Sequence, residues 1–131
     1  MATARYRFLL FVFLALHFTA FEADDNHQAK VHVISTLPKD GGQMSLTCLP
    51  ENSDPGFGGG VSAGVVYSWS VDKNLKYRCQ SFWKNQFALW VVFEPERDAN
   101  HGEVFWLVRQ DAFFLSWDNS TWVEKYTWET E

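Results

Sequence analysis

The chain has 131 residues and a formal net charge of −5 at pH 7, with 11 basic and 16 acidic side chains. Nucleic acids and anionic membranes attract clustered lysine and arginine, so we expect this acidic chain to bind neither. Aromatic residues make up 18% of the chain, which is enough to fill the core of one domain, and the length leaves no room for a second.

Residues 1–23 are predicted to be a secretory signal peptide. Arg5 and Arg7 give the start a positive charge, and an apolar run follows over residues 8–18. That run is shorter than the roughly 20 residues that a membrane-spanning helix needs, which favours a cleaved leader over the alternative of a retained anchor. We therefore expect a mature domain over residues 24–131 that is secreted, free of the membrane and held in an oxidising compartment.

The rest of the chain predicts short β-strands. Apolar and polar residues alternate over most segments, and glycine, proline or asparagine separates one segment from the next. The expected strands cover residues 30–35, 44–49, 65–72, 75–82, 86–93, 103–110, 112–117 and 122–129. About eight strands at this spacing favour an all-β fold, a small antiparallel β-sandwich in which each sheet buries one face.

Two of these strands are apolar on both faces. Residues 87–93 read Phe-Ala-Leu-Trp-Val-Val-Phe, and residues 104–108 read Val-Phe-Trp-Leu-Val. Such runs are typical of central strands covered on both sides, because an exposed version would invite aggregation. The glycine-rich residues 56–60 are instead interpreted as a flexible loop, since they neither open a helix nor precede the Gly-Lys-Ser/Thr of a phosphate-binding loop.

The only two cysteines are Cys48 and Cys79. Strict alternation puts Cys48 on the same strand face as Met44 and Leu46. It likewise puts Cys79 on one face with Tyr77, so both thiols are expected to point into the core. We predict a disulfide between these two strands, with two buried free thiols or a bridge to another chain as the alternatives.

Asn119 begins the single N-glycosylation sequon, Asn119-Ser120-Thr121. The sequon lies in a polar turn between Trp117 and Trp122, where an asparagine is expected to be exposed. We predict that Asn119 carries a glycan; the alternative is an unmodified turn residue.

Acidic residues alternate over residues 94–102 like the ligands of a calcium loop, at Glu94, Glu96 and Asp98. An EF-hand also needs a glycine at its sixth position and a glutamate at its twelfth, and neither is in register here. This segment is therefore interpreted as a solvated acidic loop, and no metal site is expected.

Motifs for catalysis are weak as well. The histidines of the mature chain are scattered, without cysteine or histidine partners at metal spacing, and His32 is expected to face outward from its strand. No Gly-x-Ser-x-Gly motif occurs, and a Ser-His-Asp triad has no local support. We expect no enzymatic activity and no cofactor, with a secreted hydrolase as a minor alternative.

Seven segments follow one another in an order that resembles a known family. They are Val-His-Val-Ile at 31–34, Leu-Thr-Cys at 46–48, Asp-Pro-Gly at 54–56, Tyr-Ser-Trp-Ser-Val at 67–71, Tyr-Arg-Cys at 77–79 with Trp83, residues 93–98, and Trp-Leu-Val-Arg-Gln-Asp at 106–111. Over about residues 30–117 this order resembles the plant self-incompatibility S1 family, the S-protein homologues. The chain departs from the family pattern at Pro55, Val71 and Ala112, and it has two cysteines where the family usually has four.

The resemblance implies a small, monomeric, extracellular signalling ligand that a cell-surface receptor recognises, in the founding members for the rejection of self pollen. Loops on a rigid scaffold tend to carry specificity, so we expect contact through the two longest polar loops, residues 52–64 and 94–102. The candidate contact residues are Asp54, Phe57, Glu94, Glu96, Arg97, Asp98 and His101.

The alternative function is that of a secreted carbohydrate-binding module that stacks sugars on exposed tryptophans. Most aromatic residues are expected to fill the core. The tryptophans at strand ends are the best candidates for exposure, and they are Trp83, Trp117, Trp122 and Trp128.

Overall fold

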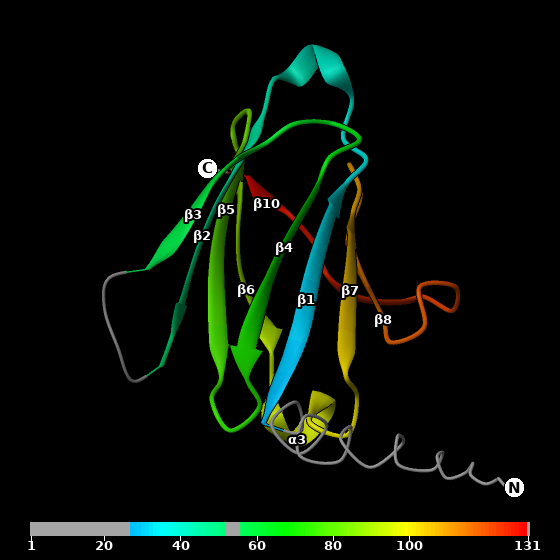
Figure 1. Ribbon diagram of the computed structural model, residues 1–131. Coiled ribbons are helices and arrows are strands. Elements are labelled where there is room, and N and C mark those ends of the chain that lie inside the picture. Colours follow the sequence, from blue (N-terminus) through cyan, green and yellow to red (C-terminus); the bar gives the residue numbers. More distant parts are fainter. Residues whose placement is uncertain (1–26, 52–55, 131) are drawn as a thin grey trace, which may run out of the picture.

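The computed structural model describes residues 27–51 and 56–130, so the predicted signal peptide and Asp54 lie outside the described residues. The described residues form ten strands in two five-stranded sheets (Figure 1). No helix within them is long and apolar enough to cross a membrane. The predicted all-β fold is confirmed.

The first sheet has the strand order β4-β1-β7-β8-β9. Its strands are β1 (Gln28–Ser35), β4 (Val66–Asp72), β7 (Glu103–Val108), β8 (Phe113–Ser116) and β9 (Val123–Tyr126). Strand β1 pairs with β7 in parallel, whereas the other neighbours are antiparallel. A turn over residues 109–112 joins β7 to β8, and within it the Arg109 backbone N–H donates to the Ala112 carbonyl at 2.9 Å.

The second sheet has the order β10-β6-β5-β2-β3, and every neighbouring pair in it is antiparallel. Its strands are β2 (Met44–Pro50), β3 (Phe57–Val61), β5 (Tyr77–Trp83), β6 (Gln86–Phe93) and β10 (Glu129–Thr130). Two short helical segments lie outside the sheets, η1 (Lys39–Gly41) and α3 (Pro95–Asp98). All eight expected strands are present: residues 86–93 keep their predicted bounds and the others have shifted ends. The strand expected over 122–129 is divided into β9 and β10, and β3 was not expected.

Aromatic side chains fill the space between the sheets. The Trp90 ring lies edge-on to Trp106, with ring centroids 5.0 Å apart, and 4.8 Å from Phe113. Each buried indole N–H in this cluster has a partner: Trp90 donates to the Ser81 hydroxyl at 3.1 Å, and Trp106 to the Val92 carbonyl at 2.9 Å. Such pairing offsets the cost of burying these two polar groups. The buried indole N–H groups of Trp69 and Trp83, in contrast, have no partner among the described residues.

The predicted disulfide between Cys48 and Cys79 is confirmed. The two residues face each other across the β2–β5 pair, with Cα atoms 4.0 Å apart. Met44 and Leu46 lie on the same fully buried face as Cys48, as the alternation predicts.

The interpretation of residues 56–60 as a flexible loop is wrong for most of the segment. Residues 57–61 form β3, which pairs with β2 and ends the second sheet. Gly58 has φ +145°, and a Cβ there would lie 1.9 Å from the Leu46 carbonyl oxygen. The absence of a side chain at Gly58 therefore allows the backbones of β2 and β3 to approach each other. From composition alone, the same glycine-rich segment was interpreted as flexible.

The prediction that both faces of residues 87–93 are covered is also wrong, although these residues do lie in a strand. Strand β6 has only the two-residue β10 beyond it, and its Leu89 side chain is 69% exposed. The matching prediction for residues 104–108 is partly right, because β7 is the middle strand of its sheet. Its inward residues, among them Trp106, are fully buried, but Phe105 and Leu107 on the other face are only half-buried.

Candidate functional site

Residues 94–102 form a turn that one buried carboxylate holds in place. Asp98, at the end of α3, has no exposed surface. Its Oδ2 accepts from the Glu94 backbone N–H at 2.9 Å, and its Oδ1 accepts from the Trp117 indole at 3.0 Å. The Arg97 guanidinium donates from Nη2 to Oδ2 at 2.7 Å and from Nε to both carboxylate oxygens. Asp98 is thus a brace, and its prediction as a receptor contact is wrong.

Arg97 is largely buried beside Asp98. Its Nη2 also donates to the Val91 carbonyl at 3.1 Å, and the guanidinium lies 5.3 Å from the centre of the Trp106 ring. Burial disfavours the charged guanidinium, but the hydrogen bond and charge attraction from Asp98, with a smaller contribution from Tyr126, outweigh it and raise the Arg97 pKa. Arg97 therefore stays charged, and little of it is left for an outside partner.

The outward part of this turn presents a different set of side chains. Glu96 is exposed, and the His101 ring stacks on Trp117 with centroids 4.5 Å apart and an interplanar angle of 9°. Glu94 is half-buried and forms a 3.5 Å ion pair with Lys76. Beside the stacked pair lies a shallow hollow of about 390 Å³, lined by His101, Leu115, Trp117, Asp118, Thr121 and Val123. Of the predicted contact residues that the structure describes, Glu96 is exposed, and the half-buried His101 borders the hollow.

The sequon lies next to this hollow. Asn119 is exposed and has φ +61°, a conformation that asparagine tolerates better than most residues. The Asp118 carboxylate accepts from the Thr121 and Ser120 backbone N–H groups at 2.8 and 2.9 Å, and these bonds lower the Asp118 pKa well below its usual range. The turn is thus hydrogen-bonded, with the Asn119 side chain at its surface.

The other predicted contacts are less available. Phe57 is half-buried at the start of β3, with its ring edge-on to Trp69 and centroids 5.4 Å apart. Of the four tryptophans expected at the surface, Trp83 and Trp128 are buried, which corrects that prediction. Trp117 is 37% exposed and Trp122 is half-buried.

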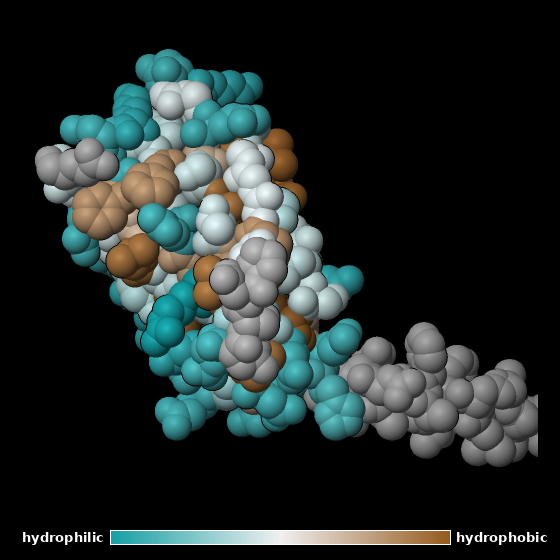
Figure 2. All heavy atoms as spheres, turned by 90° about the vertical axis from the view of Figure 1, so that its left-hand side faces the viewer, coloured by the Kyte–Doolittle hydropathy of each residue, from teal (hydrophilic) through white to brown (hydrophobic). Residues whose placement is uncertain are grey.

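The outer side of the second sheet carries an apolar surface that the sequence analysis missed. Three outward positions on each of β2, β5 and β6 form what we call the apolar face, and they are Ser45, Thr47, Leu49, Arg78, Gln80, Phe82, Phe87, Leu89 and Val91. Leu49, Phe82 and Leu89 are 38%, 41% and 69% exposed. Figure 2 shows brown and tan atoms gathered on this side of the molecule, with teal hydrophilic atoms around them. The apolar run over residues 87–93 was the sequence signal for this surface, but it predicted a strand covered on both faces.

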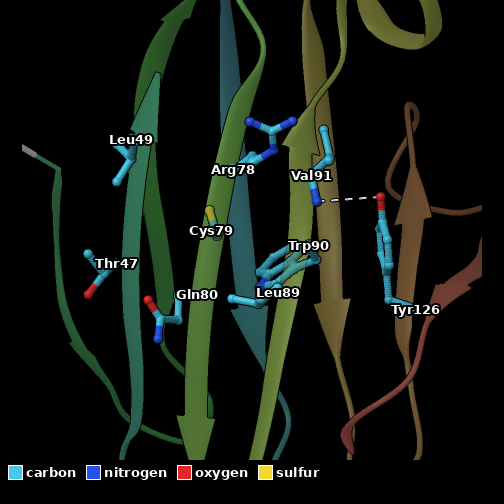
Figure 3. Close-up of a pocket in the computed structure, with 9 residues that line it drawn as sticks. All are labelled: Thr47, Leu49, Arg78, Cys79, Gln80, Leu89, Trp90, Val91 and Tyr126. Carbon is cyan, nitrogen blue, oxygen red and sulfur yellow. Dashed lines mark hydrogen bonds between the residues drawn. The ribbon is translucent and has the colours of Figure 1, made fainter. Parts of the chain in front are cut away.

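The apolar face is hollowed by a groove of about 340 Å³ (Figure 3). Thr47, Leu49, Arg78, Cys79, Gln80, Leu89, Trp90, Val91 and Tyr126 line it. Tyr126 comes from β9 of the other sheet, and its hydroxyl accepts from the Val91 backbone N–H at 3.4 Å. The groove therefore extends from the apolar face over one side of the sandwich, with one cationic side chain in its lining.

The outer side of the first sheet carries a polar cluster instead. His32 faces outward, as predicted; its Nδ1 lies 2.7 Å from the Ser68 hydroxyl and its Nε2 lies 2.8 Å from the Glu103 carboxylate. Its ring stacks on Phe105 with centroids 4.7 Å apart. The three polar residues are far apart in the sequence, so spacing gave no sign of the cluster. It links β4, β1 and β7 side by side and leaves their polar atoms paired with one another.

Comparison with known proteins gave two matches. A family model described as plant self-incompatibility protein S1 matches residues 30–128. A solved structure of SPH (Self-Incompatibility Protein Homologue) proteins, described as a widespread family of small, highly stable, secreted proteins from plants, has a similar fold. Its TM-score is 0.61 and its identity 12%, with 79% of this chain and 96% of that chain covered. No curated protein gives a significant match.

Proposed function

Because the chain belongs to the plant self-incompatibility protein S1 family, we propose that it is a signalling ligand that a cell-surface receptor recognises through its loops. The protein is secreted, as the family is. We include in this proposal the rejection of self pollen, which is the role of the founding members of the family. The observation that carries it is the braced turn at residues 94–102.

The braced turn suits recognition because it is already ordered. A loop that must be ordered on binding loses part of its binding free energy to that ordering. Here Asp98 holds the backbone at Glu94 and the indole of Trp117 from inside, so Glu96 and the stacked His101 are presented in one arrangement. A partner therefore meets a preformed surface.

Charge supports the same region. Glu96 and Asp118 are exposed, Asp118 borders the same hollow as the His101–Trp117 pair, and the chain as a whole is acidic. Exposed charges mainly speed the encounter with an oppositely charged surface and add specificity. The receptor surface that meets this end of the sandwich is accordingly proposed to be basic.

The proposal is tested by binding of the fluorescently labelled protein to protoplasts from the tissues that surround the one in which its transcript accumulates. We expect saturable binding that Glu96→Lys weakens about tenfold, the size of a lost interface contact. Asp40→Lys, which makes the same charge change at an exposed position on η1, is the control. Absence of saturable binding, or an equal loss in both variants, contradicts the proposal.

Pollen rejection needs its own test. Recombinant protein is added to pollen of the source plant and to pollen of an unrelated plant of the same species, and tube growth is measured. The proposal requires inhibition of self pollen only. Equal growth of both, or a transcript absent from the pistil, contradicts this part of the proposal.

Sugar binding is a second candidate, and Trp117 favours it. Its partly exposed ring borders the hollow next to Asp118 and Thr121, an arrangement of aromatic and polar groups that suits a sugar ring. A glycan array with wild-type protein, Trp117→Ala and Trp122→Ala tests it. Reproducible binding that either substitution abolishes supports a carbohydrate-binding module, and a blank array removes it.

We also propose that Asn119 is glycosylated, because its side chain is exposed in a turn beside the hollow. Protein made in a plant secretory host is expected to move faster on a gel after glycosidase treatment, and Asn119→Gln to match the treated form. Unchanged mobility contradicts the proposal.

A further inference from the structure

The composition of the apolar face differs from that of an ordinary solvent-facing sheet. The exposed side of an antiparallel sheet usually alternates with polar residues. Here five of the nine outward positions are apolar, three are polar without charge, and one, Arg78, is charged; the apolar ones are Leu49, Phe82, Phe87, Leu89 and Val91. Aromatic and arginine side chains with few acids or lysines are the mark of a protein interface. Contiguous apolar surface that a monomer leaves in water also points to a partner.

The rows across the strands show how the face is built. Arg78 pairs with Leu49 on one side and with Val91 on the other, so its charged group rises between two aliphatic side chains. Within residues 27–51 and 56–130 the guanidinium has no hydrogen bond and no ion pair. Figure 3 shows it at one end of the groove, with Leu89 on the neighbouring strand. A ligand that complements an aliphatic groove with one cation that no described residue neutralises would carry a carboxylate flanked by apolar groups.

A second copy of the chain meets this requirement less well. If two apolar faces packed together, both Arg78 side chains would lose water, and none of the nine positions carries a carboxylate to pair with them; the acid beside the face is Glu129 on β10, opposite Phe87. Burying a cation without a counter-ion is strongly unfavourable. Lipid bilayers are also poorly matched, because one cation on an acidic chain provides little attraction to anionic headgroups. The occupant is therefore a different molecule.

We propose that the apolar face is a docking surface for a peptide segment of the receptor that carries an aspartate or glutamate between apolar side chains. The carboxylate binds the planar Arg78 guanidinium, which offers two parallel N–H donors. The flanking side chains cover Leu89 and enter the groove between Leu49 and Tyr126. This inference rests on the proposed function, and it assigns to the sheet a contact that the loops alone do not supply.

The test uses a phage-displayed library of random linear dodecapeptides selected on the immobilised, disulfide-bonded protein. We expect enriched peptides to share an acidic residue next to aliphatic or aromatic ones. Both Arg78→Glu and Leu89→Ser are expected to weaken a selected synthetic peptide about tenfold or more, as loss of a central interface contact does. Changing the peptide acid to lysine is expected to abolish binding to the wild type and restore it to Arg78→Glu.

Matched controls lie on other surfaces of the same chain. Arg109→Glu reverses the charge of an exposed arginine at the β7–β8 turn, and Val66→Ser removes an apolar side chain that is 50% exposed on β4. Neither is expected to change peptide affinity. Enrichment without an acidic residue, equal loss in the controls, or no enrichment at all overturns the proposal. Concentration-dependent dimerisation that Leu89→Ser abolishes would also overturn it and would assign the face to a second copy of the chain. Displacement of the peptide by dodecanoate at equal affinity would overturn it as well and would assign the face to a small amphiphile.

The outcome is separable from that of the proposed function. If the protein does not bind protoplasts but the charge-swapped peptide pair binds, the receptor proposal is contradicted and the acidic-peptide surface is supported. If protoplast binding is unchanged in both Arg78→Glu and Leu89→Ser, the apolar face is not a receptor contact, and recognition through the loops is supported.

Discussion

The braced turn at residues 94–102 and the apolar face both lie at the surface, but their side chains are satisfied in opposite ways. In the turn, Asp98 collects its hydrogen-bond donors from within the chain, and Arg97 is paired with it. On the apolar face, Leu89 stands mostly in water and Arg78 lacks a counter-ion among the described residues. Groups that the fold satisfies should be needed for stability, and groups that it leaves unsatisfied should be needed for a partner.

The sharpest test of the satisfied region is Asp98→Ala. It leaves the Arg97 guanidinium buried without its carboxylate, so we expect the free energy of unfolding to fall by about 3–5 kcal/mol. Urea unfolding followed by tryptophan fluorescence measures it. Glu96→Gln, in the same turn but exposed, is expected to stay within about 0.5 kcal/mol of the wild type. Similar losses in both would break the distinction between the brace and the presented residues.

Beneath the apolar face, the disulfide joins the two strands that carry most of it. The double variant Cys48→Ala/Cys79→Ala opens a cross-link with a sequence separation of 31 residues. The chain-entropy account predicts a loss of about 3–4 kcal/mol in the free energy of unfolding. Chemical denaturation of the variant, with circular dichroism to confirm that it keeps its β-structure, measures this loss. An unchanged denaturation midpoint would mean that packing alone holds β2 to β5.

Two leucines on β2 compare the inside and the outside of the same strand. Leu46 is fully buried and Leu49 is 38% exposed on the apolar face. Leu46→Ala is expected to cost about 2–5 kcal/mol, because it leaves a cavity in the core. Leu49→Ala is expected to change stability by no more than about 0.5 kcal/mol. Thermal unfolding of both measures the difference, and a large loss for Leu49→Ala would show that the face serves the fold rather than a partner.

The smallest expected effect concerns Asp118, next to the braced turn. Backbone hydrogen bonds from Thr121 and Ser120 lower its pKa in the folded protein, so its stabilising contribution is present above the unfolded value of about 4. That contribution is lost as the pH falls from there through the lower folded value. The stability difference between wild type and Asp118→Asn should therefore shrink below about pH 4. This prediction is contradicted if the stability difference between wild type and Asp118→Asn does not change with pH, or if the difference for the control Asp111→Asn shrinks in the same way.

Much of the fold was predictable because alternation and burial agree. The inward positions of β2 and β5, including the cysteines, follow a period of two, so the disulfide and the sheet faces could be read from the pattern. The failures have physical causes. At Gly58 a close backbone contact requires a glycine, and composition does not distinguish that from flexibility. In β6 the outward Leu89 is as apolar as its buried neighbours, so the sequence of this strand shows no alternation from which its exposed face could be predicted.

The candidate site was predictable only in part. The turn at residues 94–102 could be found as a long polar segment, but the interior role of Asp98 depends on Trp117, which is 19 residues away. The cluster around His32 likewise depends on residues 36 and 71 positions away. Such contacts are set by strand order rather than by local sequence, and a single sequence does not encode strand order in its periodicity.

The parallel pairing of β1 with β7 has a consequence for biogenesis. Strand β1 is made first, yet both of its neighbours in the sheet, β4 and β7, are made much later. Contacts between distant parts of a chain slow folding, since a long segment must lose its freedom before they form. The first sheet is therefore completed only once most of the polypeptide has been synthesised, whereas β5 and β6 meet as a local hairpin. A nascent chain stalled before Glu103 could pair β1 with β4, but the other edge of β1 would stay unpaired because β7 would not yet exist.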